Sequence, residues 1–156
     1  MDRSRRNVLK GTGELAVLGL MVSSGLLRAG TARAEAWNKA AFETKSFADT
    51  VKALGGGGST ESDQIQMTTP DIAENGAVVP VTVESRLPGT RRIAILIEKN
   101  PNTLSADFTL PEGTDPFVTT RVKMAETSNV YALVQSGGKF YHAAKEIKVT
   151  IGGCGG

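Results

Sequence analysis

The chain contains 156 residues, of which 18 are Lys or Arg and 16 are Asp or Glu, giving a formal net charge of +2 at neutral pH. This length suffices for one domain with a hydrophobic core and is too short for two, once a leader is set aside. The single cysteine, Cys154, excludes an internal disulfide framework.

The first 34 residues have the features of a twin-arginine signal peptide. Arg5 and Arg6 form the arginine pair, residues 15–27 are moderately apolar, and residues 32–34 have the small-x-small pattern of a cleavage site. The apolar run is interrupted and shorter than the roughly 20 residues of a membrane span, so we expect no membrane anchor. The sequence therefore predicts export, cleavage near residue 34 and a periplasmic protein.

Removal of this leader changes the charge balance. Residues 1–34 hold six of the 18 basic residues and two of the 16 acidic ones, which leaves 12 basic and 14 acidic residues in the mature chain. The mature net charge is then about −2, which removes the main support for binding to nucleic acid or to an anionic membrane.

Residues 35–54 have the apolar spacing of one amphipathic helix. Its apolar positions are Trp37, Phe42, Phe47, Val51 and Leu54. Four glycines at residues 55–58 end this helix and predict a flexible joint. A phosphate-binding loop is disfavoured here, because no strand precedes the glycines and no lysine stands at the required position.

Residues 59–151 predict an immunoglobulin-like antiparallel β-sandwich. Short apolar alternations are separated by turn signals such as Asn75-Gly76 and Gly137-Gly138. Residues 93–97 are continuously apolar, which favours a strand buried on both faces. The predicted strands lie at residues 65–67, 79–83, 93–97, 104–110, 117–124, 130–134, 140–144 and 147–151.

The last predicted strand alternates apolar and charged residues. Apolar side chains at positions 147, 149 and 151 are expected to face inward, while the charges of Lys145, Glu146 and Lys148 face outward. This strand should anchor whatever follows it.

Residues 152–156 read Gly-Gly-Cys-Gly-Gly. Because Gly152, Gly153, Gly155 and Gly156 place no side chain beside the thiol, the segment is expected to be a thin and mobile arm. Three extended residues separate Cys154 from Ile151, so the thiol can reach about 10 Å beyond the fold.

Cys154 lacks the neighbours of a self-sufficient catalytic thiol, since no Lys, Arg or His lies within the last seven residues. His142, the only histidine, is expected to be a surface or half-buried strand residue without a chemical role. Cys154 and His142 are too few ligands for a metal site, and no cofactor motif is present. The carboxylates at turns and outer faces are expected to be solvated: Asp71, Glu74 and Glu84.

The terminal Gly-Gly-Cys-Gly-Gly resembles the carrier motif of the SoxY family, the substrate-carrying subunits of bacterial periplasmic thiosulfate oxidation. The resemblance extends to the twin-arginine leader and to residues 72–76, 79–81, 100–101 and 149–151. It implies that Cys154 is the covalent attachment point for sulfur intermediates and that the four glycines form an arm that enters partner active sites. It also implies a carrier protein and not an enzyme.

The resemblance implies a set of partners as well. The first is a SoxZ-like β-sandwich subunit, which forms a heterodimer with this chain; a disulfide through Cys154 can join two heterodimers into a heterotetramer. The others are a c-type cytochrome that loads thiosulfate, a thiosulfohydrolase and a sulfane dehydrogenase.

Two other classes of function remain open at this point. One is a sulfur carrier activated as a thiocarboxylate on Gly156, which needs ATP and conflicts with export. The other is a periplasmic interaction module in which Cys154 forms an intermolecular disulfide.

Overall fold

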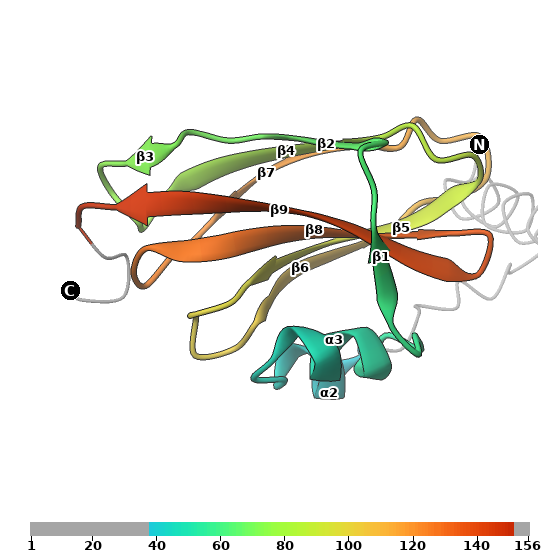
Figure 1. Ribbon diagram of the computed structural model, residues 1–156, viewed down its shortest axis with the longest axis horizontal. Helices are drawn as coiled ribbons and strands as arrows, with labels where there is room; N and C mark the ends of the chain where they lie inside the picture. The colour runs from blue at the N-terminus through green and yellow to red at the C-terminus, as the bar shows by residue number, and fades with distance from the viewer. Residues whose placement is uncertain (1–37, 152–156) are drawn as a thin grey trace, which may run out of the picture. The chain divides into compact units, whose positions relative to one another are not determined.

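The computed structural model describes residues 38–151 (Figure 1). The chain divides into a unit of residues 1–37 and a second unit that begins at Asn38, and all described residues belong to the second. The predicted leader, Trp37 and the predicted arm at 152–156 lie outside the described residues. Within residues 38–151, no helix has the length and apolarity needed to cross a membrane.

Two short helices replace the single helix predicted for residues 35–54. They are α2 (Lys39–Phe42) and α3 (Phe47–Ala53). Thr44 Oγ1 donates a hydrogen bond to the Ala41 carbonyl at 2.7 Å, just after α2. Ser46 then caps α3, because its side-chain oxygen accepts a hydrogen bond from the Asp49 N–H at 3.1 Å. These polar residues lie where one helix ends and the next begins. The single helix was predicted from the spacing of apolar residues alone, which does not include them.

In the described residues 38–151, nine strands form two sheets, which confirms the predicted sandwich. The larger sheet has the order β1-β9-β8-β5-β6, with β3 also paired to β9, and the smaller sheet has the order β2-β4-β7. The strands are β1 (Ser59–Glu61), β2 (Ile65–Thr68), β3 (Ile72–Ala73), β4 (Val79–Ser85), β5 (Thr90–Ile97), β6 (Leu104–Thr109), β7 (Phe117–Val122), β8 (Ser128–Ser136) and β9 (Lys139–Val149).

The seven longer strands follow an immunoglobulin-like order. The first, second and fifth of them, β2, β4 and β7, share one sheet, and the third, sixth and seventh, β5, β8 and β9, share the other. The fourth, β6, pairs with β5. Gly137 and Gly138, at φ values of 57° and 77°, form the tight turn between β8 and β9 that the sequence predicts.

Strand β5 is buried on both faces, as predicted for residues 93–97. Ile93, Ile95 and Ile97 belong to the core between the two sheets. Ala94 and Leu96 belong to a second core, which α2 and α3 form against the outer face of the larger sheet (Figure 1). The predicted helix face is also confirmed, since the side chains of Val51 and Leu54 are buried in this second core, with those of Phe42 and Phe47 packed against it.

The glycine segment after α3 ends the helix as predicted. Gly55 has a φ of 92°, and its N–H donates to the Lys52 carbonyl at 2.9 Å. Gly56 lies against the sheet, where an added Cβ would come within 2.7 Å of a ring carbon of Phe140. Glycine is therefore required at Gly56 by close packing.

Strand β9 differs from the prediction in two ways. It is one strand where two were expected, because its register with β8 is continuous from Lys139 to Ile147. The expectation that Lys145 faces outward is wrong: Lys145 lies on the same face of β9 as the buried Ile147. Ile151 follows the end of the strand and is exposed, where an inward position was expected. The short parallel pairings of β1 and β3 with β9 were not predicted.

Candidate functional site

The predicted site residues Gly152, Gly153, Cys154, Gly155 and Gly156 lie outside the described residues. The structure does describe the segment from which they continue, residues 149–151, here called the root. The surroundings of the root define the candidate site.

Hydrogen bonds to residues 73–76 hold the root in place. The Thr150 N–H donates to the Ala73 carbonyl at 3.1 Å, and Thr150 Oγ1 donates to the Glu74 carbonyl at 2.9 Å. The Gly76 N–H donates to the Ile151 carbonyl at 2.7 Å. The end of β9 therefore remains attached to the fold for two residues beyond the strand.

The turn that holds the root is attached to a second loop. The Met124 N–H donates to the Gly76 carbonyl at 2.7 Å. Asn100 fixes this second loop from both sides, because its Nδ2 donates to the Lys123 carbonyl at 2.7 Å and its Oδ1 accepts from the Ala125 N–H at 3.0 Å. A continuous set of hydrogen bonds thus runs from Asn100 to Ile151.

These contacts bring together three segments that carry the resemblance in sequence, namely residues 72–76, 100–101 and 149–151. They are distant along the chain, and all three meet at the end of the sandwich where β9 ends (Figure 1). Their shared role is to position the root. Asn75 contributes within its own turn, where its Oδ1 accepts from the Ala77 N–H at 2.8 Å.

An ion pair fastens the segment just before β3 to β9, near the root. Lys145 Nζ lies 2.8 Å from Asp71 Oδ1 and donates to the Thr69 carbonyl at 3.0 Å. The hydrogen bond and the charge of Lys145 hold the pKa of Asp71 below its ordinary value of 3.8. The Lys148 N–H adds a bond to the Asp71 carbonyl at 3.0 Å. Asp71 is exposed, as the sequence predicts, but it has a structural partner that local sequence did not indicate.

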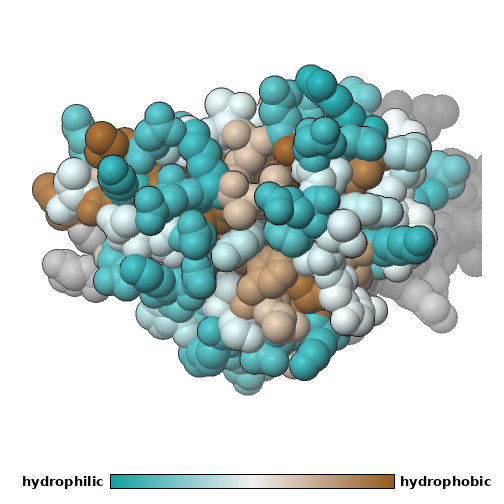
Figure 2. All heavy atoms as spheres, in the orientation of Figure 1, coloured by the Kyte–Doolittle hydropathy of each residue, from teal (hydrophilic) through white to brown (hydrophobic). Residues whose placement is uncertain are grey.

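Exposed apolar side chains gather around the root. Ile72, Val78 and Ile151 are 58%, 54% and 68% exposed, and they are three of the four exposed large hydrophobic residues in the described part of the chain. Figure 2 shows hydrophobic residues at the end of the molecule where Figure 1 places β3 and the end of β9. We call these three residues the root surface. Apolar groups exposed together in this way are typical of a surface that meets another protein.

His142 has structural partners, and its half-buried position in β9 agrees with the prediction. Its Nδ1 lies 2.9 Å from Ser59 Oγ, and its ring packs edge-on against Phe47 at a centroid distance of 5.2 Å. Tyr131 adjoins the same rings, and burial, followed by the charge of Glu98, raises the pKa of Tyr131. Among residues 38–151, no group of three or more His, Cys, Asp or Glu residues could hold a metal ion.

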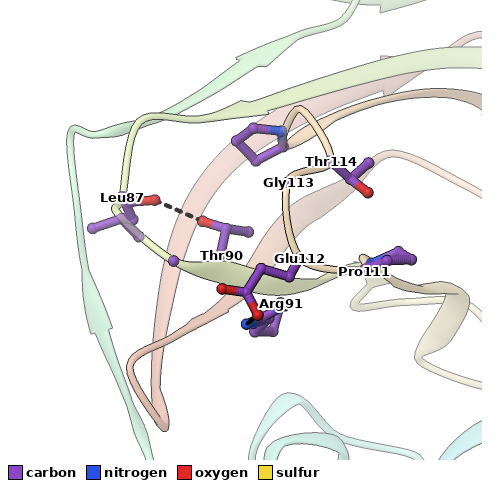
Figure 3. A pocket seen from close by; sticks show the side chains of 9 residues that line it. Leu87, Thr90, Arg91, Pro111, Glu112, Gly113 and Thr114 are labelled. Atoms are coloured by element: carbon purple, nitrogen blue, oxygen red, sulfur yellow. Dashed lines mark hydrogen bonds and ion pairs between the residues drawn. The ribbon is translucent and has the colours of Figure 1, made fainter.

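A cavity of about 190 Å³ lies at the far end of the sandwich, between the β4–β5 turn and the β6–β7 loop (Figure 3). Arg91 and Glu112 point toward one another at its mouth, with 3.0 Å between Arg91 Nη2 and Glu112 Oε2. Thr90 Oγ1 donates to the Leu87 carbonyl at 2.9 Å within the wall. The charged groups at this cavity, Arg91 and Glu112, pair with each other, and the cavity lies away from the root.

Comparison with known proteins agrees with the motif at the C-terminus. The model of the family described as sulfur oxidation protein SoxY matches residues 51–154, a range that includes Cys154. The solved structure of the sulfur carrier protein SoxY from Chlorobium limicola f thiosulfatophilum is 40% identical, with a TM-score of 0.63, and the match covers 72% of this chain and 99% of that one.

Two further solved structures are more distant. A superoxide reductase (neelaredoxin) from Ignicoccus hospitalis is 20% identical, with a TM-score of 0.49, over 55% of this chain and 80% of its own. The human F-spondin reeler domain is 12% identical, with a TM-score of 0.40, over 61% of this chain and 95% of its own. Neither likeness indicates a function, and no curated protein matches the chain. The family match and the 40% identity together show that this chain belongs to the SoxY family of sulfur oxidation proteins.

Proposed function

We propose that this protein carries sulfur intermediates covalently on the thiol of Cys154 and presents them to the enzymes of a Sox system. The observation that carries this proposal is that the family match extends through Cys154, the only thiol in the chain. The solved relative is itself described as a sulfur carrier protein. The role is that of a carrier and not of an enzyme.

The chemistry of loading needs an electron acceptor. The thiol of Cys154 and thiosulfate join through a new sulfur-sulfur bond, giving a cysteine S-thiosulfonate, one proton and two electrons. A c-type cytochrome partner takes the two electrons. Hydrolysis by a thiosulfohydrolase then replaces the terminal sulfonate with a proton from water, releasing sulfate and leaving a persulfide on Cys154. The persulfide on Cys154 is then the substrate of a sulfane dehydrogenase.

The geometry of the root supports such a role. A carrier must fix the base of its arm while the thiol enters other proteins, and the root is held by hydrogen bonds at Thr150 and Ile151. The root surface supplies apolar contacts where each partner would approach. Glycines on both sides of Cys154 keep the segment narrow enough for a channel.

Export and assembly follow from the same proposal. Residues 1–34 would direct the chain to the periplasm through the twin-arginine route. There it would pair with a SoxZ-like β-sandwich subunit, and a disulfide through Cys154 would join two such heterodimers.

The test is to replace the thiol and follow the pathway. Cys154→Ser should abolish thiosulfate-dependent electron transfer in the reconstituted system, because a hydroxyl cannot form the sulfur-sulfur bond. The free energy of unfolding should change by less than about 0.5 kcal/mol, the usual range for surface sites. Retained electron transfer in the variant would overturn the proposal.

Peptide mapping separates the remaining alternatives. Trypsin cleaves after Lys148 and releases residues 149–156 as one peptide. In protein isolated from its host, we expect the sulfur adduct on Cys154. An adduct on the carboxyl of Gly156 would indicate a thiocarboxylate carrier. A peptide found solely as a disulfide-linked dimer would indicate an interaction module.

A further inference from the structure

Asn75-Gly76 is the only Asn-Gly pair in the chain, and it lies in the turn between β3 and β4 to which the root is bonded. Figure 1 places this turn beside the end of β9. Asparagine deamidates most readily when glycine follows it, because glycine has no side chain to hinder attack by its backbone nitrogen on the asparagine carboxamide. The pair is therefore a candidate site of chemical modification.

Deamidation at this pair needs no reagent except water. The Gly76 backbone nitrogen loses its proton and attacks the side-chain carbonyl carbon of Asn75. The carbon–nitrogen bond of the carboxamide breaks, and ammonia leaves with a proton equivalent to the one removed. Water then opens the resulting succinimide at either of its two carbonyls. One product is aspartate in the ordinary linkage, and the other is isoaspartate, in which the side-chain carbon has entered the main chain; no oxidation or reduction occurs.

In the folded chain the attacking nitrogen is held by the root. The Gly76 N–H donates to the Ile151 carbonyl at 2.7 Å, and Gly76 is buried although Asn75 is exposed. The hydrogen bond keeps the proton on the nitrogen, and burial keeps away the base that must remove it. The protection therefore comes from a segment that is distant in sequence.

The carboxamide of Asn75 is held as well. Its Oδ1 accepts from the Ala77 N–H at 2.8 Å, and the Asn75 carbonyl accepts from the Val78 N–H at 3.4 Å, which closes the turn. The bond to Ala77 fixes the orientation of the carboxamide. It thus opposes the rotation that would present the carboxamide carbon to the Gly76 nitrogen.

We propose that Asn75 is a deamidation site that the root keeps closed. When the root separates from the turn, the Gly76 nitrogen is released and Asn75 reacts. The isoaspartyl product lengthens the main chain by one carbon–carbon bond, about 1.5 Å, so Gly76 no longer fits between its partners Ile151 and Met124. The reaction makes a reversible opening of the root permanent, and it does not depend on the carrier function.

Hydrogen exchange at Gly76 reports the same opening. Deamidation and exchange both require release of the Gly76 N–H, so each rate is the open fraction multiplied by the rate in an unstructured chain. In any variant that loosens the root, deamidation at Asn75 and exchange at Gly76 should therefore rise by the same factor.

Peptide mapping measures the reaction in the full mature chain. Trypsin releases residues 53–86, in which Asn75 is the only asparagine. The protein is kept in mildly alkaline buffer below its unfolding temperature, and the mass and isoaspartate content of this peptide are followed with time. Because the root must open first, deamidation should be at least about tenfold slower than in the isolated peptide. Asn129, which precedes a valine, should stay unmodified and serves as an internal control.

A matched pair of variants tests the part played by the root. Thr150→Val loosens the root, because it removes the hydrogen bond from Thr150 Oγ1 to the Glu74 carbonyl. It should raise both rates at least about threefold, the order expected for the loss of one hydrogen bond. Thr82→Val removes a hydroxyl that is bonded to Thr119 at 3.0 Å on the smaller sheet, and it should leave both rates unchanged.

Two variants at position 75 separate the added charge from the longer backbone. Asn75→Asp adds the carboxylate alone and should leave exchange at the Met124 amide, which donates to the Gly76 carbonyl, as in the parent. Deamidated parent that contains isoaspartate, separated by ion exchange, should exchange faster there. Asn75→Ser can form the same turn through its hydroxyl, and its Met124 amide should stay protected after long incubation.

Deamidation of the folded parent at the rate of the isolated peptide, or equal rates in Thr150→Val and Thr82→Val, would overturn the closed site. Unchanged exchange at Met124 in the isoaspartyl protein would overturn its effect on the root. Neither result bears on the carrier function, which Cys154→Ser tests separately.

Discussion

Asn100→Ala should loosen the loop that supports the root. Asn100 makes two hydrogen bonds to backbone groups of residues 123 and 125, at 2.7 and 3.0 Å. A typical intramolecular hydrogen bond contributes about 0.5 to 1.5 kcal/mol net, which gives a range of about 1 to 3 kcal/mol for the pair. Because the site is only partly buried, water can replace part of the loss, so we expect about 1 to 2 kcal/mol.

Urea unfolding at 25 °C, followed by circular dichroism, measures this change as a lower midpoint at an unchanged slope. In a domain of this size, the same loss should lower the melting temperature by roughly 4 to 8 °C. Native-state hydrogen exchange should localise the effect, with faster exchange at the amides of Met124 and Ala125, and at Gly76, whose carbonyl accepts from Met124.

Asn102→Ala is the control for the same loop. Asn102 is exposed and accepts one hydrogen bond, from Lys45 at 2.6 Å, so its loss should cost less than about 0.5 kcal/mol. Equal destabilisation by the two variants, or an Asn100→Ala effect spread evenly over all amides, would refute the view that Asn100 holds this loop.

Three further predictions concern the base of the arm, the arm and the leader. Lys145 lowers the pKa of Asp71, so the ion pair contributes stability above pH 3.8 and this stability is lost as the pH falls through the lowered pKa. Protection of the amides at the end of β9 from exchange should therefore fall in acid, and Asp71→Asn should abolish this pH dependence. A variant with the same pH profile of protection as the parent would contradict the prediction. Gly153→Val should slow enzymatic loading at least about tenfold, a difference of roughly 1.4 kcal/mol, because the β-branched side chain widens and stiffens the arm that enters the partner's channel. Alkylation of Cys154 by iodoacetamide should stay normal. Loading at the parent rate would argue against a narrow channel. Arg5→Lys with Arg6→Lys should leave the precursor in the cytoplasm, as cell fractionation would show, and undiminished periplasmic protein would rule out twin-arginine export.

The strand pattern and the terminal motif could be recognised from the sequence alone. Alternation of apolar and polar residues with a period of two indicates which side chains face the core, and turn residues mark where the chain reverses, so the sandwich could be predicted. The continuously apolar residues 93–97 predicted a strand buried on both faces. Cys154 stood out because it is the only thiol and is flanked by glycines. These are local properties, and each needs only a few neighbouring residues to be recognised.

Tertiary structure alone decided how the root is held. The bonds from Thr150 to Ala73, and from Asn100 to the loop at residues 123–125, join segments that are distant in sequence, and no local pattern encodes such pairings. The predicted outward position of Lys145 was wrong for the same reason. Its charge predicts an outward position, but a carboxylate and a carbonyl from another part of the chain satisfy it on the inward face. Hydrogen bonds and ion pairs between distant segments depend on the packed sheets, so they appear only once the chain has folded.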